Sequence, residues 1–152
     1  MRVLPEPDEV KMKGIYSACL MIHRQAFSGI EQMTAATFFK EYNRSALFVH
    51  RNNIGQIVAF AMVTISRGQP WLMEIAVHAD WRGQGIGSSL LREVDQWAKS
   101  MNYDYIELTV KVNNPAQKLY FDHGYRVEKV LERYYLQEGD GLLMHLNLRR
   151  TV

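Results

Sequence analysis

Apolar residues recur along the first third of this chain with two periods, one typical of helices and one typical of strands. Residues 10–27 and 34–42 have helical periodicity, and Thr34 stands where the second helix would have its N-terminal cap. Runs of β-forming residues at 46–50 and 57–65 flank Asn52-Asn53-Ile54-Gly55, whose Asn and Gly residues suit a hairpin turn. The pattern therefore predicts two helices followed by a β-hairpin.

The middle of the chain predicts a strand that runs through a glycine-rich loop into a helix. The apolar run WLMEIAV at 71–77 contains a single Glu and reads as a buried strand, and the loop RGQGIG follows at 82–87. The next residues are apolar on one helical face, at Ile86, Leu90, Leu91, Val94, Trp97, Ala98 and Met101.

The last third of the chain predicts three strands and a short helix. Residues 105–112 alternate between apolar and polar side chains, Asn114-Pro115 is typical of a helix start, and Gly124 is typical of a helix end. Two final strands, at 126–136 and 142–148, flank an acidic turn. The full order, α-α-β-β-β-α-β-α-β-β, predicts an α/β fold with a sheet of mixed direction, in one domain over residues 1–152.

Composition excludes several classes of protein. With 47% hydrophobic and 22% charged residues, the chain has the composition of an ordinary globular protein. A net charge of +2, with no Lys/Arg cluster among aromatic residues, does not indicate a nucleic-acid partner. Its apolar stretches are too short to cross a membrane, and the N-terminal segment, with its acids and prolines, does not resemble a signal peptide. Because a single cysteine, Cys19, cannot form an internal disulfide, we expect a cytoplasmic protein.

The histidines do not follow the spacing of a metal site. They stand singly at positions 23, 50, 78, 123 and 145, without a His-x3-His or Cys-x2-Cys pair. The sequence therefore predicts no bound metal.

The glycine-rich loop is typical of an anion-binding site, because a helix N-terminus offers unpaired N–H groups and the positive end of its dipole. A Walker loop is excluded because no Lys follows these glycines. The spacing Gly-x-Gly-x-Gly in mid-chain also differs from the Gly-x-Gly-x-x-Gly of dinucleotide-binding folds.

The arrangement Arg-x-x-Gly-x-Gly after a strand resembles motif A of the GNAT acetyltransferases, and NNPAQKLYFDHGY at 113–125 resembles their motif B. The element order is similar to the GNAT fold, a central mixed, mostly antiparallel sheet flanked by about four helices. Two further segments, RQAF at 24–27 and RYY at 133–135, resemble the subgroup of ribosomal-protein-alanine and other protein N-terminal acetyltransferases. That subgroup often has Pro after the Phe, where this chain has Ser28.

The resemblance implies acetyl-coenzyme A as the donor. The loop amides and Arg82 would hold its pyrophosphate, the end of the strand would pair with its pantetheine arm, and the Ile75 N–H would polarise the thioester carbonyl. The cofactor-binding residues implied in this way are Ile75, Ala76, Val77, Arg82, Gly83, Gln84, Gly85, Ile86, Gly87, Ser88, Asn113, Ala116 and Tyr120.

Two further catalytic candidates are Tyr120, which the same resemblance implies, and Glu74, which is a nearby carboxylate. Tyr120 would protonate the leaving thiolate as a general acid, or else pack its helix on the sheet. The two positions at which the family often has a base are occupied by Leu108 and Trp71, neither of which can take a proton. Glu74 is a nearby carboxylate, with a catalytic or a structural role, and strand alternation predicts that it lies on the face opposite Trp71 and Met73. The same rule places Glu107 opposite Leu108.

The missing base favours an acceptor that is easily deprotonated. A lysine amine, with a pKa of about 10.4, costs about 4–5 kcal/mol to neutralise at pH 7, whereas an α-amine near 7.7–8.0 costs only about 1 kcal/mol. The sequence therefore favours a peptide or protein N-terminus, and the resemblance to protein N-terminal acetyltransferases implies Phe27, Tyr134 and Tyr135 as candidate acceptor-binding residues. One alternative acceptor is a polyamine-like or aminoglycoside-like amine, which an acidic cleft would favour. A second alternative is an acyl-coenzyme A-binding module without catalysis. The chain could also form a homodimer that is paired through a sheet edge. The carboxylates that such a cleft would use are Glu74, Glu107, Glu132, Glu138 and Asp140.

Overall fold

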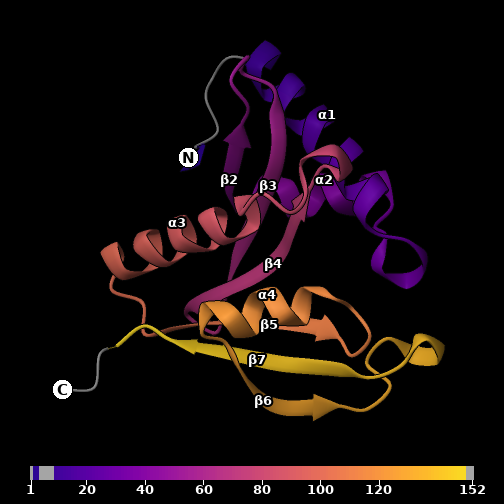
Figure 1. Ribbon diagram of the computed structural model, residues 1–152, viewed down its shortest axis with the longest axis vertical. Helices are drawn as coiled ribbons and strands as arrows, with labels where there is room; N and C mark the ends of the chain where they lie inside the picture. Colours follow the sequence, from indigo (N-terminus) through magenta and orange to yellow (C-terminus); the bar gives the residue numbers. More distant parts are fainter. Residues whose placement is uncertain (1, 4–8, 150–152) are drawn as a thin grey trace.

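A computed structural model, which describes residues 2–3 and 9–149, contains a seven-stranded sheet in the order β1-β2-β3-β4-β5-β7-β6 (Figure 1). The strands are β1 (Arg2–Val3), β2 (Ala46–Arg51), β3 (Ile57–Ser66), β4 (Gln69–Val77), β5 (Tyr105–Lys111), β6 (Arg126–Leu131) and β7 (Gly141–Asn147). The helices are α1 (Glu9–Ala26), α2 (Ala35–Arg44), α3 (Ile86–Ser100) and α4 (Ala116–His123), with short 3-10 turns η1 (Gly29–Glu31), η2 (Ala79–Trp81) and η3 (Leu136–Glu138). Neighbouring strands are antiparallel except β4 and β5, which are parallel.

The sheet separates two hydrophobic cores. Alternate residues of β2, β3 and β4 point to opposite faces, so Val49 and Phe60 pack against α1 and α2, whereas Phe48 and Ala61 pack against α3. The α3 side also contains the inward face of β5, including Leu108, which is buried. Among the described residues, no helix is both long and apolar enough to cross a membrane.

The predicted α/β fold with a mixed, mostly antiparallel sheet and four helices is confirmed. Thr34 caps α2 by accepting a hydrogen bond from the Thr37 N–H (3.2 Å), and the Asn114 side chain accepts one from the Ala116 N–H (2.9 Å). Gly124 ends α4 with a positive φ of 122°, as its position predicted. The sequence reading did not include β1, the two-residue strand that pairs with β2.

One predicted strand is too long. The prediction extended the first C-terminal strand to residue 136, but β6 ends at Leu131. Arg133 and Leu136 have left-handed φ angles of 51° and 54°, which a strand cannot contain. The Arg133 N–H also donates to Asp140 Oδ1 (2.8 Å). The aromatic residues after β6 therefore belong to the connection with β7.

The sheet opens between its two halves, because β4 and β5 are paired at a single position, Trp71 with Glu107. One edge of β4 pairs with β3 from Gln69 to Val77, whereas its other edge has no strand partner beyond Trp71. In Figure 1, β4 rises away from the β5–β7 layer accordingly. The backbone of residues 75–77 therefore has no strand partner on the side of β5.

A β-bulge in β4 corrects the predicted orientation of Glu74. Met62 pairs with Glu74 and the next residue of β3, Val63, pairs with Leu72, so Met73 is an extra residue in β4. Leu72 lies in the α3-side core, while Met73 packs on the α1 side and Glu74 bonds to α1. Glu74 and Met73 therefore lie on the same side of the sheet, and the alternation-based prediction was wrong. Glu107 does lie on the face opposite Leu108, as predicted.

Candidate functional site

The glycine-rich loop forms an exposed N-terminus for α3. Gly83 and Gly85 each have a φ of 78°, a conformation that side chains with a Cβ rarely adopt. The Ser89 N–H donates to the Gly85 carbonyl (3.0 Å) in the first turn of α3. The amides of residues 86–88 consequently have no carbonyl acceptor within the helix. They are available to an anion at the positive end of the helix dipole.

Gly87 has a different structural role from the other two glycines. A Cβ at this position would lie 3.1 Å from Leu119 Cδ2 of α4. The absence of a side chain therefore allows α3 and α4 to approach closely. This packing holds α4, and with it Tyr120, against the start of α3.

Arg82 connects the loop to the end of β4. Its Nε donates to the Val77 carbonyl (3.1 Å), which directs the guanidinium along the open edge of the strand. A positive charge thus lies beside the unpaired amides of the loop, an arrangement that favours phosphate groups.

A cavity of about 430 Å³, which we call the β4 groove, extends from Arg82 along the open edge of β4 to α4. Eight of the residues predicted from the sequence line it: Phe27, Ile75, Ala76, Val77, Arg82, Asn113, Ala116 and Tyr120. The other predicted donor-binding residues, Gly83, Gln84, Gly85, Ile86, Gly87 and Ser88, form the adjacent loop and first turn of α3. The structure thus brings the predicted donor-binding residues together.

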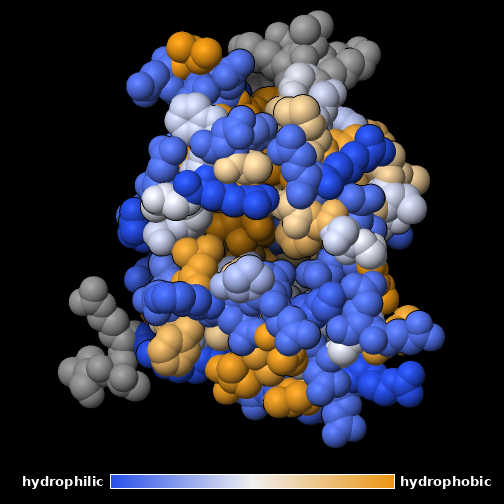
Figure 2. All heavy atoms as spheres, turned by 45° about the vertical axis from the view of Figure 1, so that its right-hand side comes forward, coloured by the Kyte–Doolittle hydropathy of each residue, from blue (hydrophilic) through white to orange (hydrophobic). Residues whose placement is uncertain are grey.

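A second cavity of about 230 Å³, the tyrosine pocket, lies beyond the β4 groove. Five predicted residues line it besides Ile75: Phe27, Glu74, Tyr120, Tyr134 and Tyr135. On the face shown in Figure 2, apolar residues lie at the bottom of a hollow that hydrophilic residues surround. The rings of Tyr134 and Tyr135 contact each other edge to face, with centroids 5.0 Å apart.

Tyr120 lines both cavities and stands where they meet. Its ring packs on Tyr125 with centroids 5.8 Å apart. Burial, followed by the negative charge of Glu74, raises the pKa of Tyr120 well above its ordinary value. The phenol therefore remains protonated at neutral pH and can donate a proton or a hydrogen bond into either cavity.

Glu74 forms a buried pair with His23 of α1, a residue that sequence reasoning missed. The Met33 N–H donates to His23 Nε2 (2.8 Å), so in the neutral ring the proton is on Nδ1, which donates to Glu74 Oε1. The other carboxylate oxygen, Oε2, is buried and has no partner among the described residues. Burial raises the pKa of Glu74, although the hydrogen bond from His23 opposes this effect.

Three further residues that the sequence did not indicate as a group, Lys111, Glu31 and Glu138, are paired beside the two cavities; Glu31 lines both cavities and Lys111 lines the β4 groove. Lys111 Nζ lies 2.8 Å from Glu138 Oε1 and 3.7 Å from Glu31 Oε1. Glu138 Oε2 in turn accepts a hydrogen bond from the Ile30 N–H (2.7 Å). Asn114, predicted only as a helix cap, also donates to Glu31 Oε2 (3.4 Å). This set, which we call the pocket clamp, ties the α1–α2 connection to β5 and to the β6–β7 connection.

The structure does not assemble the acidic cleft that a polyamine acceptor would favour. Of the five carboxylates considered from the sequence, Glu74 alone lines the tyrosine pocket in the part of the chain that the structure describes, and Glu31, which also lines it, is paired with Lys111. Glu138 is paired with Lys111, and Asp140 accepts the Arg133 N–H. Glu107 lies farther along β5, in a neighbouring cavity.

The family model and the relatives that match this chain all belong to acetyltransferases. The model of the acetyltransferase (GNAT) family matches residues 16–125. An N-acetyltransferase of Methanocaldococcus jannaschii is 34% identical over 92 residues, which cover 59% of this chain and 59% of that protein. The matched part therefore spans less than two thirds of this relative. A ribosomal-protein-alanine N-acetyltransferase of Bacillus subtilis is 27% identical over 82% of this chain and 85% of its own length.

Solved structures have the same fold. The ribosomal-protein-alanine N-acetyltransferase of Escherichia coli superposes with a TM-score of 0.79 at 22% identity, covering 100% of this chain and 97% of that chain. A GNAT acetyltransferase of Elizabethkingia anophelis with acetyl-CoA bound gives a TM-score of 0.68 at 19% identity, covering 75% and 83%.

Proposed function

This chain belongs to the GNAT family of acetyltransferases, and we propose that it transfers an acetyl group from acetyl-coenzyme A to the α-amine of a peptide or protein N-terminus. The observation that carries the proposal is the junction of the two cavities. The β4 groove and the tyrosine pocket both contain Ile75 and Tyr120, at the place where β4 and β5 separate. A donor in the groove and an acceptor in the pocket would therefore meet beside one buried tyrosine.

The groove has the donor set that acetyl-coenzyme A needs. The unpaired amides of residues 86–88 and Arg82 suit a pyrophosphate, and the open edge of β4 offers backbone groups to the amides of a pantetheine arm. When bound, acetyl-coenzyme A supplies an activated acetyl group as a thioester. The Ile75 N–H is our candidate for polarising its carbonyl, a contact worth roughly 3–4 kcal/mol in comparable sites.

Glu74 is our candidate for receiving the proton of the acceptor amine. Its Oε2 is without a partner among the described residues, and its raised pKa makes it a stronger base than an exposed carboxylate. His23 is a positioning residue, because its Nδ1–H fixes the other oxygen. As the new N–C bond forms and the C–S bond breaks, Tyr120 would give its proton to the departing sulfur, and the proton of the amine would go to Glu74 directly or through water.

Three observations favour an α-amine over other acceptors. The tyrosine pocket contains one unpaired carboxylate oxygen and no acidic cleft, which argues against a polycation. Tyr134 and Tyr135 line the pocket, and tyrosine hydroxyls suit hydrogen bonds to a peptide backbone. Two of the proteins named above, those of Bacillus subtilis and Escherichia coli, also act, by their names, on a ribosomal-protein alanine.

The experiment is a measurement of thiol release from acetyl-coenzyme A with short N-terminal peptides, spermidine and an aminoglycoside as acceptors. We expect turnover with peptides, and a fall in kcat of about 10²-fold or more for Tyr120→Phe. Tyr103→Phe, which alters a tyrosine packed on Trp97 outside both cavities, is the matched control and should leave the rate unchanged. Turnover on spermidine without turnover on any peptide would refute the acceptor class. Tight donor binding with no turnover on any acceptor would instead indicate a binding module.

The role of Glu74 is tested by the pH dependence of the same reaction. Because the base must be ionised, the rate should fall as the pH falls through the raised pKa of Glu74, which lies above its ordinary 4.5. Glu74→Gln keeps an acceptor for the His23 Nδ1–H but removes the base. We expect this variant to lose kcat while retaining the KM for acetyl-coenzyme A. An unchanged kcat across the pH range would assign Glu74 a structural role only.

A further inference from the structure

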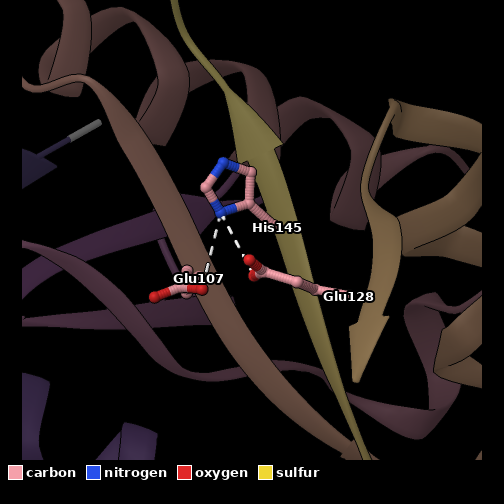
Figure 3. A group of neighbouring side chains, drawn as sticks. All are labelled: Glu107, Glu128 and His145. Atoms are coloured by element: carbon pink, nitrogen blue, oxygen red, sulfur yellow. Dashed lines mark hydrogen bonds and ion pairs between the residues drawn. The ribbon is translucent and has the colours of Figure 1, made fainter. Parts of the chain in front are cut away.

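Three side chains with metal-binding donor atoms meet on the face of the C-terminal half-sheet that lies opposite α4. Glu107 of β5 and His145 of β7 are direct cross-strand partners, and Glu128 belongs to β6, the strand on the other side of β7. Figure 3 shows both carboxylates directed toward the same edge of the imidazole. One donor atom from each residue lies within 4.8 Å of the others.

The distances within this group fit ligands around an ion better than they fit hydrogen bonds. His145 Nδ1 lies 3.4 Å from Glu107 Oε2 and 3.5 Å from Glu128 Oε2. Both separations are long for a hydrogen bond. Ligands that lie about 2.0–2.1 Å from a tetrahedral Zn²⁺ are separated by about 3.3–3.4 Å from each other. An ion between these atoms would therefore require only small side-chain movements.

The backbone holds two of the three ligands in this arrangement. The pairing of β6 with β7 shifts between Val127 and Lys129, so Glu128 is the extra residue of a β-bulge, a device that redirects a side chain. The ring of Tyr105 stacks on the His145 ring, with centroids 4.7 Å apart at an angle of 27°, and so restricts its rotation.

The two carboxylates of this group favour the binding of a cation. Among the described residues, the ion pairs of Glu107 and Glu128 are formed with His145 and with no Lys or Arg. Two carboxylates at this distance repel each other unless a positive charge lies between them.

We propose that Glu107, Glu128 and His145 form a binding site for a divalent transition-metal ion, with Zn²⁺ as the best match. The imidazole distinguishes this site from one for Mg²⁺ or Ca²⁺, which prefer oxygen ligands alone. Three protein ligands leave the fourth position of a tetrahedral ion to water. Such an ion would connect β5, β6 and β7, the strands next to the connection that carries Tyr134 and Tyr135. The proposal is independent of the acetyl-transfer reaction.

The test is a titration of chelator-treated, full-length protein with Zn²⁺, followed by calorimetry and by the Tm. We expect one ion per chain and a rise in Tm for the unaltered protein. His145→Ala and Glu128→Gln should each weaken Zn²⁺ binding at least about tenfold, since even residues behind a metal ligand contribute that much. Glu132→Gln, which removes an exposed carboxylate just after β6, is the matched control and should bind as tightly as the unaltered protein.

The spectrum of Co²⁺ gives a second measurement that does not depend on stability. Co²⁺ in a site of low coordination number should give visible absorption that disappears in His145→Ala. Because Glu128 is exposed, Glu128→Gln is expected to fold even if His145→Ala does not. The proposal is overturned if the unaltered protein binds no stoichiometric Zn²⁺. It is equally overturned if Glu128→Gln and a folded His145→Ala both bind the ion as tightly as the unaltered protein.

Discussion

The contact between Gly87 and Leu119 gives a quantitative test of how closely α3 and α4 are packed. In Gly87→Ala the new Cβ would lie 3.1 Å from Leu119 Cδ2, so the leucine must move by a few tenths of an ångström. Gly14, in α1, offers a matched comparison because a Cβ there meets nothing within 4 Å. The two substitutions are chemically identical and differ in the space around the new methyl group.

The expected magnitudes follow from this difference. An Ala in place of Gly stabilises a helix interior by about 0.5–1 kcal/mol, and we expect Gly14→Ala to gain this amount. Gly87 is in the first turn of α3, so Gly87→Ala gains at most the same helix stabilisation. Overpacking against Leu119 lowers its free energy of unfolding by about 1–3 kcal/mol. The free energy of unfolding of Gly87→Ala should therefore lie about 1–3 kcal/mol below that of Gly14→Ala.

Urea unfolding of both variants measures the difference, provided that their m-values agree. In a Leu119→Ala background the clash is absent, and Gly87→Ala should become neutral or stabilising. If Gly87→Ala stabilised the otherwise unaltered protein as much as Gly14→Ala does, Leu119 would be free to move, and the close packing inferred for the two helices would be refuted.

Other parts of the structure give three further predictions. Thr34→Ala should lower the free energy of unfolding by about 1 kcal/mol in urea, because it removes the cap on the Thr37 N–H, whereas Thr34→Ser should retain most of it. The hydrogen bond with Lys111 lowers the pKa of Glu138 below 4.5, so the stability that this pair contributes is present above pH 4.5 and is lost as the pH falls through the lowered pKa. Glu138→Gln should show a smaller fall in Tm on acidification, and an equal fall would contradict the assignment. Leu108→Ala should lower the free energy of unfolding, measured with urea, by about 2–5 kcal/mol because the leucine side chain is fully buried. A decrease below about 1 kcal/mol would show that the core collapses into the space left by the side chain.

The features that local sequence determines could be predicted well. Helical periodicity, the Thr34 cap and the Gly124 stop depend on neighbouring residues, and they located the helices to within two or three residues. The loop at 82–87 is equally local, because positive φ angles at Gly83 and Gly85 follow from their lack of a side chain. The residues that we propose to bind acetyl-coenzyme A could therefore be predicted from the sequence.

The acceptor side depends on pairings between distant residues, which spacing rules do not reveal. The bulge at Met73 is set by the pairing of β4 with β3, so alternation alone assigned Glu74 to the wrong face. His23 is 51 residues from Glu74, and nothing near it in sequence indicates a carboxylate partner. Glu107, Glu128 and His145 likewise come from three different strands, so their spacing in the sequence does not indicate that their side chains lie close together.

The pocket clamp also has a consequence for the order in which the molecule assembles. The bond between the Ile30 N–H and Glu138 spans 108 residues, and the bond between Asn114 and Glu31 spans 83. Contacts of such large separation close only after the intervening chain has folded, because loop-closure entropy opposes them. The tyrosine pocket should thus be among the last regions to form and the first to open, so that native-state hydrogen exchange would show the Ile30 amide less protected than those of β3.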